Sequence, residues 1–278
     1  MKMNKNKQIL QAFFYLILPL CVCCSSNTMP DSDPPIKKDG EKVEDKPMKV
    51  TDFIKDYKLT FEDNFNGMAI DFSKWKYRAE NTVRQYATVS RETIQLDGEG
   101  NLVIQTLKKD GKYYVGQLTT DGLFNQRYGY FECRAKVNRS LGTHCAFWLQ
   151  TNTMGVETND PQNNGVEIDI FEYHRKTSNQ VHHNLHWNGY GQGHKQEGIS
   201  KYVLNIGTGF HTFGLLWTEK EYIFFVDGEE SWRTTKAVSR IPEYMILSTE
   251  LTGFGGDPNA GQYPDSVVFD YVRTYIPR

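Results

Sequence analysis

Residues 165–173 read GVEIDIFEY and place three carboxylates within otherwise apolar, β-prone sequence. Alternate side chains of a strand share a face, so Glu167 and Asp169 point the same way and the isoleucines point the opposite way. Glu172 comes five residues after Glu167, and one extra residue, a β-bulge, returns it to the face of the other two acids. The stretch therefore predicts a bulged strand with three acids on one face.

Three acids on one face of a buried strand favour acid–base chemistry. Like charges this close raise the pKa of one carboxyl, which then keeps its proton near neutral pH. A double-displacement glycosidase needs that combination, with an ionised carboxylate as nucleophile and a protonated carboxyl as acid. Acids that alternate with apolar residues also form the solvent face of amphipathic strands, so the rest of the chain has to distinguish the two interpretations.

A second polar strand follows the acids, over residues 181–187. Alternation puts His182, Asn184 and His186 on one face. If this strand neighbours the acid strand, the same face lines the same cleft. Imidazoles and an amide there could bond sugar hydroxyls and orient a carboxylate. The alternative interpretation is that these are structural histidines, satisfied within the fold.

Aromatic residues make up 13% of the chain, with 16 Tyr, 16 Phe and 5 Trp. Carbohydrate sites use aromatic faces to stack on sugar rings, and an aromatic β-core would have the same composition. Trp148 and Trp217 are candidate stacking platforms, with core packing as the alternative for each. The net charge is -2 with both signs interspersed, which favours neither a nucleic-acid partner nor a membrane-surface patch.

Residues 1–24 resemble a bacterial lipoprotein signal. Three lysines precede an apolar run that is short for a membrane span. The run ends in Cys23 and Cys24, which are both candidates for lipidation. Neither has the usual small residue before it, so cleavage without lipidation is the alternative. The pattern predicts an exported protein on the bacterial outer membrane or cell surface, with a lipid anchor as its only membrane contact.

Residues 25–50 are rich in Pro, Asp and Lys and have too few apolar side chains to fold. They are predicted to be a flexible linker. Residues 51–278 then form one domain, long enough for a single large core. Its two cysteines, Cys133 and Cys145, either pair or remain buried thiols, and the sequence leaves both possibilities open.

The predicted domain consists of short strands separated by turn signals, with almost no helical period. Residues 128–137 alternate cleanly, residues 146–150 form a short apolar run, and residues 222–228 run into an Asp-Gly turn. Many strands of this length indicate an all-β sandwich or barrel of antiparallel sheets.

Seven segments in order resemble glycoside hydrolase family 16, the β-jelly-roll enzymes that cut β-1,3, β-1,4 and related glycan backbones. The acid strand resembles the bulged signature of laminarinase-type and agarase-type members. The resemblance implies a sandwich of two curved antiparallel sheets with a concave substrate cleft. The segments are LTFEDNF (59–65) with Trp75, GYFECRAK (129–136), AFWL (146–149), EIDIFE (167–172), HTFGLLW (211–217), YIFFVDG (222–228) and DSVVFDYVRTY (265–275).

The resemblance also implies a role for each acid. Glu167 would attack the anomeric carbon, and Glu172 would protonate the leaving oxygen and then activate water. Asp169 would hydrogen-bond the nucleophile. Retaining chemistry needs the two reacting carboxyls about 5–5.5 Å apart, which bulged neighbours on one strand face can meet. The sugar at the cut would be supported by His186 and His182 from the side and by Trp148 from beneath.

Some residues depart from the family pattern. Residues 144–145 are His-Cys where Trp-Pro or similar is usual, Glu250 replaces a small apolar residue, and the loop 188–194 differs from the commonest laminarinases. Glu250 is therefore a candidate substrate-binding residue. Asp270 matches a position that often helps to hold a structural calcium, although one carboxylate more often is an ordinary strand-end acid.

The resemblance predicts a retaining endo-β-glycanase that needs no cofactor and acts as a monomer on a polysaccharide or oligosaccharide. A β-1,3- or mixed-linkage glucan is the favoured substrate, and a galactan is possible. One alternative is a transglycosylase, which uses the same intermediate with a sugar acceptor. Another is a glycan-binding protein without catalysis, against which the presence of all three acids argues.

Overall fold

The computed structural model describes residues 46–278, which form one compact unit. The predicted export signal, Cys23 and Cys24, and most of the predicted linker lie outside the described residues. The last linker residues belong to the compact unit, where the Met48 N–H donates to Glu230 Oε2 at 2.8 Å. No helix among the described residues is long and apolar enough to cross a membrane.

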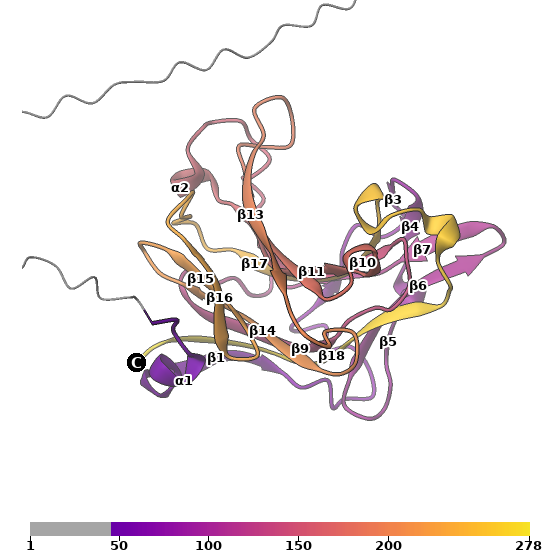
Figure 1. Ribbon diagram of the computed structural model, residues 1–278, viewed down its shortest axis with the longest axis horizontal. Helices are drawn as coiled ribbons and strands as arrows, with labels where there is room; N and C mark the ends of the chain where they lie inside the picture. The colour runs from indigo at the N-terminus through magenta and orange to yellow at the C-terminus, as the bar shows by residue number, and fades with distance from the viewer. Residues whose placement is uncertain (1–45) are drawn as a thin grey trace, which may run out of the picture. The chain divides into compact units, whose positions relative to one another are not determined.

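Two β-sheets pack face to face in the described part of the chain, as predicted, and Figure 1 shows them as two layers. The smaller sheet runs, in spatial order, through β13 (Lys195–Tyr202), β12 (Gln180–Trp187), β11 (Glu167–His174), β10 (Thr143–Gln150), β17 (Tyr244–Leu251), β8 (Gln117–Thr119) and β2 (Lys76–Tyr77). The larger sheet runs through β16 (Glu229–Thr234), β15 (Tyr222–Val226), β14 (His211–Trp217), β9 (Gly129–Lys136), β18 (Asp265–Pro277), β6 (Leu102–Lys109), β7 (Lys112–Val115), β4 (Ala87–Val89) and β3 (Val83–Arg84), with β1 (Tyr57–Asp63) on β18 and β5 (Ile94–Leu96) on β6.

Helices are few and short in the residues that the structure describes. One strand pair also departs from the predicted antiparallel pattern, because β4 and β7 run parallel with Ala87 opposite Tyr113. The helices are α1 (Val50–Phe53), α2 (Pro161–Asn164) and the 3-10 turns η1 (Ile54–Asp56), η2 (Arg91–Thr93), η3 (Arg175–Thr177), η4 (Gly253–Gly255) and η5 (Pro258–Ala260).

The core between the two sheets fixes which face of β11 looks inward. Ile168 and Ile170 are fully buried. Phe171 stacks on Phe213 of β14 in the opposite sheet, with ring centroids 3.9 Å apart. Full burial of one such side chain stabilises a fold by about 1.5–3 kcal/mol. This packing holds the apolar face of β11 against the core and directs the acids to the outer face.

The predicted bulge is present in β11. On the neighbouring strand, consecutive residues Phe147 and Trp148 pair with Phe171 and Asp169, so one residue of β11 has no partner. The register toward β12 also shifts between Asp169 and Glu172. The extra residue returns Glu172 to the face of the other acids, as the spacing predicts.

Trp217 corrects one of the predictions. It lies in β14 of the larger sheet and is fully buried. Its indole N–H donates to the Ser239 carbonyl at 3.2 Å, and its ring stacks on Phe131. Because it points into the core from the sheet that lacks the acids, it cannot stack on a sugar in their cleft. Core packing, the alternative interpretation, is correct.

Cys133 and Cys145 are both buried and free, so the domain has no disulfide between them. Burial raises the pKa of both thiols, which keeps them protonated. The sequence left a disulfide and two buried thiols as possibilities, and the structure shows the buried thiols.

Candidate active site

A cleft of about 390 Å³ opens on the outer face of the smaller sheet. Its floor comes from β10, β11 and β17, and its rim includes Arg78, Arg84 and Tyr190 from loops and a short edge strand. The floor residues are the three acids of β11, His144, Ala146, Trp148 and Gln150 of β10, and Ser248 and Glu250 of β17.

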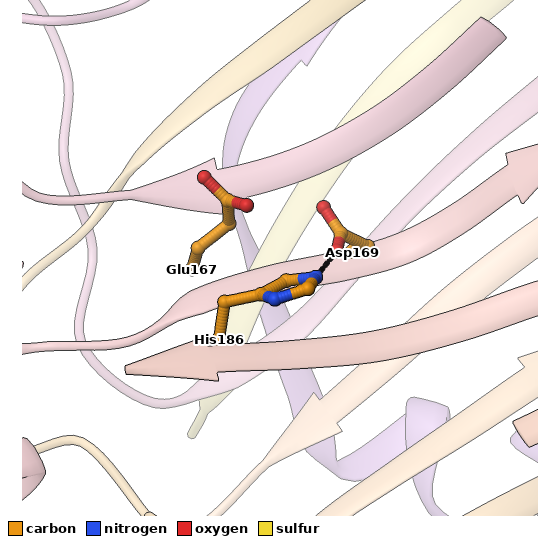
Figure 2. A group of neighbouring side chains, drawn as sticks. All are labelled: Glu167, Asp169 and His186. Carbon is orange, nitrogen blue, oxygen red and sulfur yellow. Dashed lines mark ion pairs between the residues drawn. The ribbon is translucent and has the colours of Figure 1, made fainter. Parts of the chain in front are cut away.

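The polar strand β12 lies beside the acid strand, as predicted. The amide of Asn184 donates to Glu172 Oε2 at 2.6 Å. The Nε2 atom of His186 lies 3.4 Å from Asp169 Oδ2, and Figure 2 shows the imidazole directed at that carboxylate. The register places Glu167 opposite His186, Asp169 opposite Asn184, and Glu172 opposite His182.

Two side chains that the sequence did not single out hold the carboxylate of Glu167. The Gln150 amide donates to Glu167 Oε2 at 2.8 Å, and the Tyr190 hydroxyl donates to the same oxygen. Gln150 also donates to the Tyr190 oxygen at 2.6 Å. Gln150 could have been found, because it shares the face of Trp148 two residues earlier in β10. Tyr190 lies in a loop, where no periodicity points to it.

The proton states of the other two acids follow from burial. Burial raises the pKa of Glu172 well above its usual range, and the charge of Asp169 raises it further. Burial and the charge of Glu167 also raise the pKa of Asp169. A nearby imidazole, His144, lies 3.8 Å from Glu172, and burial lowers its pKa to about 3. Glu172 is therefore a neutral acid beside a neutral imidazole.

Trp148 lines the cleft, but only 6% of its surface is exposed. Its indole N–H donates to Ser248 Oγ at 3.1 Å, and the guanidinium of Arg78 lies 4.9 Å from the ring centroid. Trp148 thus lies in the cleft, and Arg78 and the neighbouring strands leave only a small part of its ring open.

Glu250 also lines the cleft, as predicted for a substrate-binding residue. Its carboxylate pairs with Arg84 at 3.1 Å and accepts a hydrogen bond from Gln117. Burial raises the pKa of Glu250, while the positive charge of Arg84 opposes this shift. The pair therefore presents a carboxylate and a guanidinium to the cleft, both of which bond hydroxyl groups.

His182 does not reach the cleft, contrary to the prediction that it supports the sugar. Its Nδ1 lies 2.8 Å from Ser200 Oγ, its Nε2 lies 3.1 Å from Thr177 Oγ1, and 7% of the residue is exposed. Both ring nitrogens are occupied within the fold. His182 is a structural histidine, while His186 keeps its contact with Asp169.

Asp270, the residue that the resemblance links to a structural calcium, has a protein partner in this structure. The carboxylate pairs with Arg134, whose guanidinium stacks over Phe210. Calcium takes six to eight oxygen ligands. Among the described residues, the one group of three acidic, His or Cys donors close enough to hold a metal is in the cleft, not at Asp270. That group is Glu167, Asp169 and His186, with donor atoms within 4.8 Å of one another (Figure 2).

The structure is a jelly-roll sandwich, and the floor of its cleft carries three acids on one bulged strand. This combination is typical of one class of glycosidases. The family model for glycosyl hydrolases family 16 matches residues 81–273. The chain belongs to glycoside hydrolase family 16.

Two of the relatives of this chain are bacterial β-glycan hydrolases by name. The β-glucanase of Rhodothermus marinus is 30% identical over 247 residues, which cover 79% of this chain and 85% of that protein. The endo-1,3-1,4-β-glycanase ExsH of Rhizobium meliloti is 33% identical over 165 residues, or 59% of this chain. The matched segment spans 33% of ExsH, so the chain corresponds to about a third of that relative.

Among solved structures, the chain resembles SCLam, a non-specific endo-β-1,3(4)-glucanase of family GH16. The TM-score is 0.68 at 29% sequence identity, and the match covers 80% of this chain and 92% of that chain. This similarity supports the jelly-roll assignment over nearly the whole described domain.

Proposed function

We propose that this protein is a retaining endo-β-glycanase that hydrolyses a polysaccharide backbone by double displacement. The observation that carries the proposal is the asymmetry of the two outer acids of β11. Glu167 accepts hydrogen bonds from Gln150 and Tyr190, whereas desolvation raises the pKa of Glu172, whose side chain is 15% exposed. One acid is thus arranged as a nucleophile and the other as a proton donor.

In the first step, Glu167 attacks the anomeric carbon and forms a glycosyl ester while the glycosidic bond breaks. Glu172 gives its proton to the leaving oxygen. In the second step, the Glu172 carboxylate takes a proton from water, which attacks the anomeric carbon and releases Glu167. Burial raises the pKa of Asp169, between them on the strand, which disfavours a further negative charge beside the nucleophile.

The favoured substrate is a β-1,3- or mixed-linkage β-glucan, and a galactan is the second choice. The names of the relatives support a glucan, since both the Rhodothermus marinus and Rhizobium meliloti proteins are β-glucan or β-glycan hydrolases by name. The Arg84–Glu250 pair is a charged feature of the cleft that such a substrate would meet. We also propose that the protein acts as a monomer.

The test compares the wild-type domain with Glu167→Gln on laminarin, barley β-glucan and agarose. Release of reducing ends by the wild type and its loss in the variant are the expected result. Equal absence of activity in both proteins, with binding retained, would leave only a glycan-binding protein. Products longer than a defined oligosaccharide substrate would identify a transglycosylase instead of a hydrolase.

We also propose export and lipid anchoring at the bacterial outer membrane or cell surface, through Cys23 or Cys24. The support is the apolar run that ends in cysteines and is followed by a polar linker. A fatty-acid analogue fed to expressing bacteria should label the wild type and one of the variants Cys23→Ala and Cys24→Ala. Labelling of the double variant would contradict the proposal.

A further inference from the structure

The order of the two outer acids along β11 gives the cleft a direction. In the proposed reaction, Glu172 protonates the leaving oxygen, so the leaving part of the glycan departs on the Glu172 side of the reacting sugar. Beyond Glu172, β11 continues to His174, which pairs with His144 of β10. On the other side, His182 of β12 lies opposite Glu172. Of these three imidazoles, His144 lines the cleft at its leaving-group end, and His174 and His182 lie next to it, buried within the fold.

Phe254 of η4 packs against all three imidazoles. Its ring centroid lies 4.4 Å from His174, 5.2 Å from His182 and 5.5 Å from His144, with the rings steeply inclined. Burial lowers the pKa of His174 to about 4 and that of His144 to about 3, so these rings are neutral at pH 7. Phe254 still exposes 38% of its surface, which leaves part of an apolar ring at this end of the cleft.

Phe254 is continuous with the cleft. Thr252, two residues earlier, lines the cleft and lies 3.4 Å from His144 Nδ1. The Thr252 hydroxyl also accepts the Phe254 N–H at 3.3 Å, which fixes the turn that carries the ring. A glycan that leaves the acids at Glu172 therefore meets this turn next.

A second exposed aromatic residue, Tyr86, lies on a loop that is joined to the same turn. The Gly253 N–H donates to Gln85 Oε1 at 3.1 Å, across 168 residues of sequence. Tyr86 is 54% exposed and borders, with Tyr113 and Gly253, a surface pocket of about 360 Å³. Two loops that are distant in sequence thus meet at the leaving-group end, and each carries an exposed aromatic ring, which together are called the aromatic rim below.

We propose that Phe254 and Tyr86 form a subsite for the sugars on the leaving side of the cut. The occupant is the pyranose chain of the substrate itself, because the rim continues the cleft past the proton donor. Exposed aromatic rings lose apolar hydration when the apolar face of a sugar covers them. An aromatic surface with a few polar groups is also the usual composition of a ligand site. The inference rests on the proposed function, since the acids give the direction.

The same subsite would bind an acceptor sugar for transfer. In that step, the ester bond between the anomeric carbon and Glu167 breaks as a bond to the acceptor oxygen forms. The acceptor hydroxyl gives its proton to the Glu172 carboxylate. Occupation of the rim by a sugar should therefore increase transfer relative to hydrolysis.

The test compares a substrate whose leaving group would contact Phe254 and Tyr86 with a substrate whose leaving group would not. The wild type, Phe254→Ala and Tyr86→Ala are compared on laminarin and on a nitrophenyl laminaribioside, whose small leaving group carries no sugar. The expected result is a loss of roughly 3- to 10-fold in kcat/KM on laminarin for each variant, the scale of one aromatic contact, with the nitrophenyl substrate unaffected. The fraction of transfer to added laminaribiose should fall in parallel.

Two controls make the outcome decisive. Tyr202→Ala removes a tyrosine that is 62% exposed on the edge strand β13 and should change neither substrate. Phe254→Trp keeps an aromatic surface and should retain activity on laminarin. Unchanged laminarin activity in both alanine variants, or equal losses on both substrates, would overturn the subsite. A wild type that cleaves neither substrate would instead contradict the proposed glucan hydrolysis.

Discussion

The two ends of β11 carry the same side chain in opposite surroundings. At one end, Glu167 meets an amide and a hydroxyl that both donate to it. At the other end, Glu172 is partly buried near neutral imidazoles and accepts one amide hydrogen bond from Asn184. Two glutamates of one strand can therefore act as nucleophile and as acid, because the side chains around each of them differ.

The largest effect is expected at the donor-rich end. Glu167→Gln keeps the size of the side chain and removes the nucleophile, so kcat should fall by at least about 10⁴-fold on every substrate. Initial rates on polysaccharide and on an aryl glycoside measure this. The thermal midpoint should stay close to that of the wild type. Substantial residual activity on both substrates would place the nucleophile elsewhere.

The same Glu-to-Gln substitution at Glu172 should have a different effect on activity. Glu172→Gln removes the proton donor, so activity on polysaccharide should fall by roughly 10²- to 10⁴-fold, the contribution of general acid catalysis. A dinitrophenyl glycoside has a leaving group that needs no proton, and its first step should remain fast. A burst of released dinitrophenol would reveal this step. Equal loss on both substrates would show that the two ends do not differ as proposed.

How far the sequence predicts this site depends on whether a residue follows strand alternation. The bulge and the shared face of the three acids follow from spacing alone, and so do Asn184 and His186. Trp148 and Trp217 both lie in alternating strands, yet only the packing of two sheets decides which one faces the core. Each sheet has one face toward the core, and the sequence does not say which alternating set of side chains lies on that face.

Loop residues were beyond prediction for a different reason. Tyr190 reaches Glu167 from the β12–β13 loop, and Gln85 holds Gly253 across the rim of the cleft. Such contacts depend on where loops meet after folding, which local sequence does not encode. The parallel pairing of β4 with β7 is hidden for the same reason, since its partners are set by the course of the intervening chain.

A smaller effect should sharpen the description of the Glu167 end. Tyr190→Phe removes one of the two donors to the nucleophile and leaves the ring in place. A hydrogen bond to a charged group contributes roughly 1.5–3 kcal/mol, so kcat/KM should fall by about 10- to 100-fold. Tyr202→Phe is the matched control on an exposed edge strand and should be silent. Wild-type kinetics in Tyr190→Phe would mean that Gln150 alone holds the carboxylate.

The smallest effect, a shift in pH dependence, tests the Glu172 end. Glu172 must be protonated to act as the acid, so activity falls as pH rises through its pKa. The amide of Asn184 stabilises the ionised form and thus lowers this pKa against the effect of burial. Asn184→Ala should therefore raise the pKa and move the alkaline limb of the kcat/KM profile to higher pH. Asn101→Ala, which removes an amide bound to Asp97 at 2.7 Å, is the control. A limb that moves to lower pH, or stays in place, would mean that another group sets it.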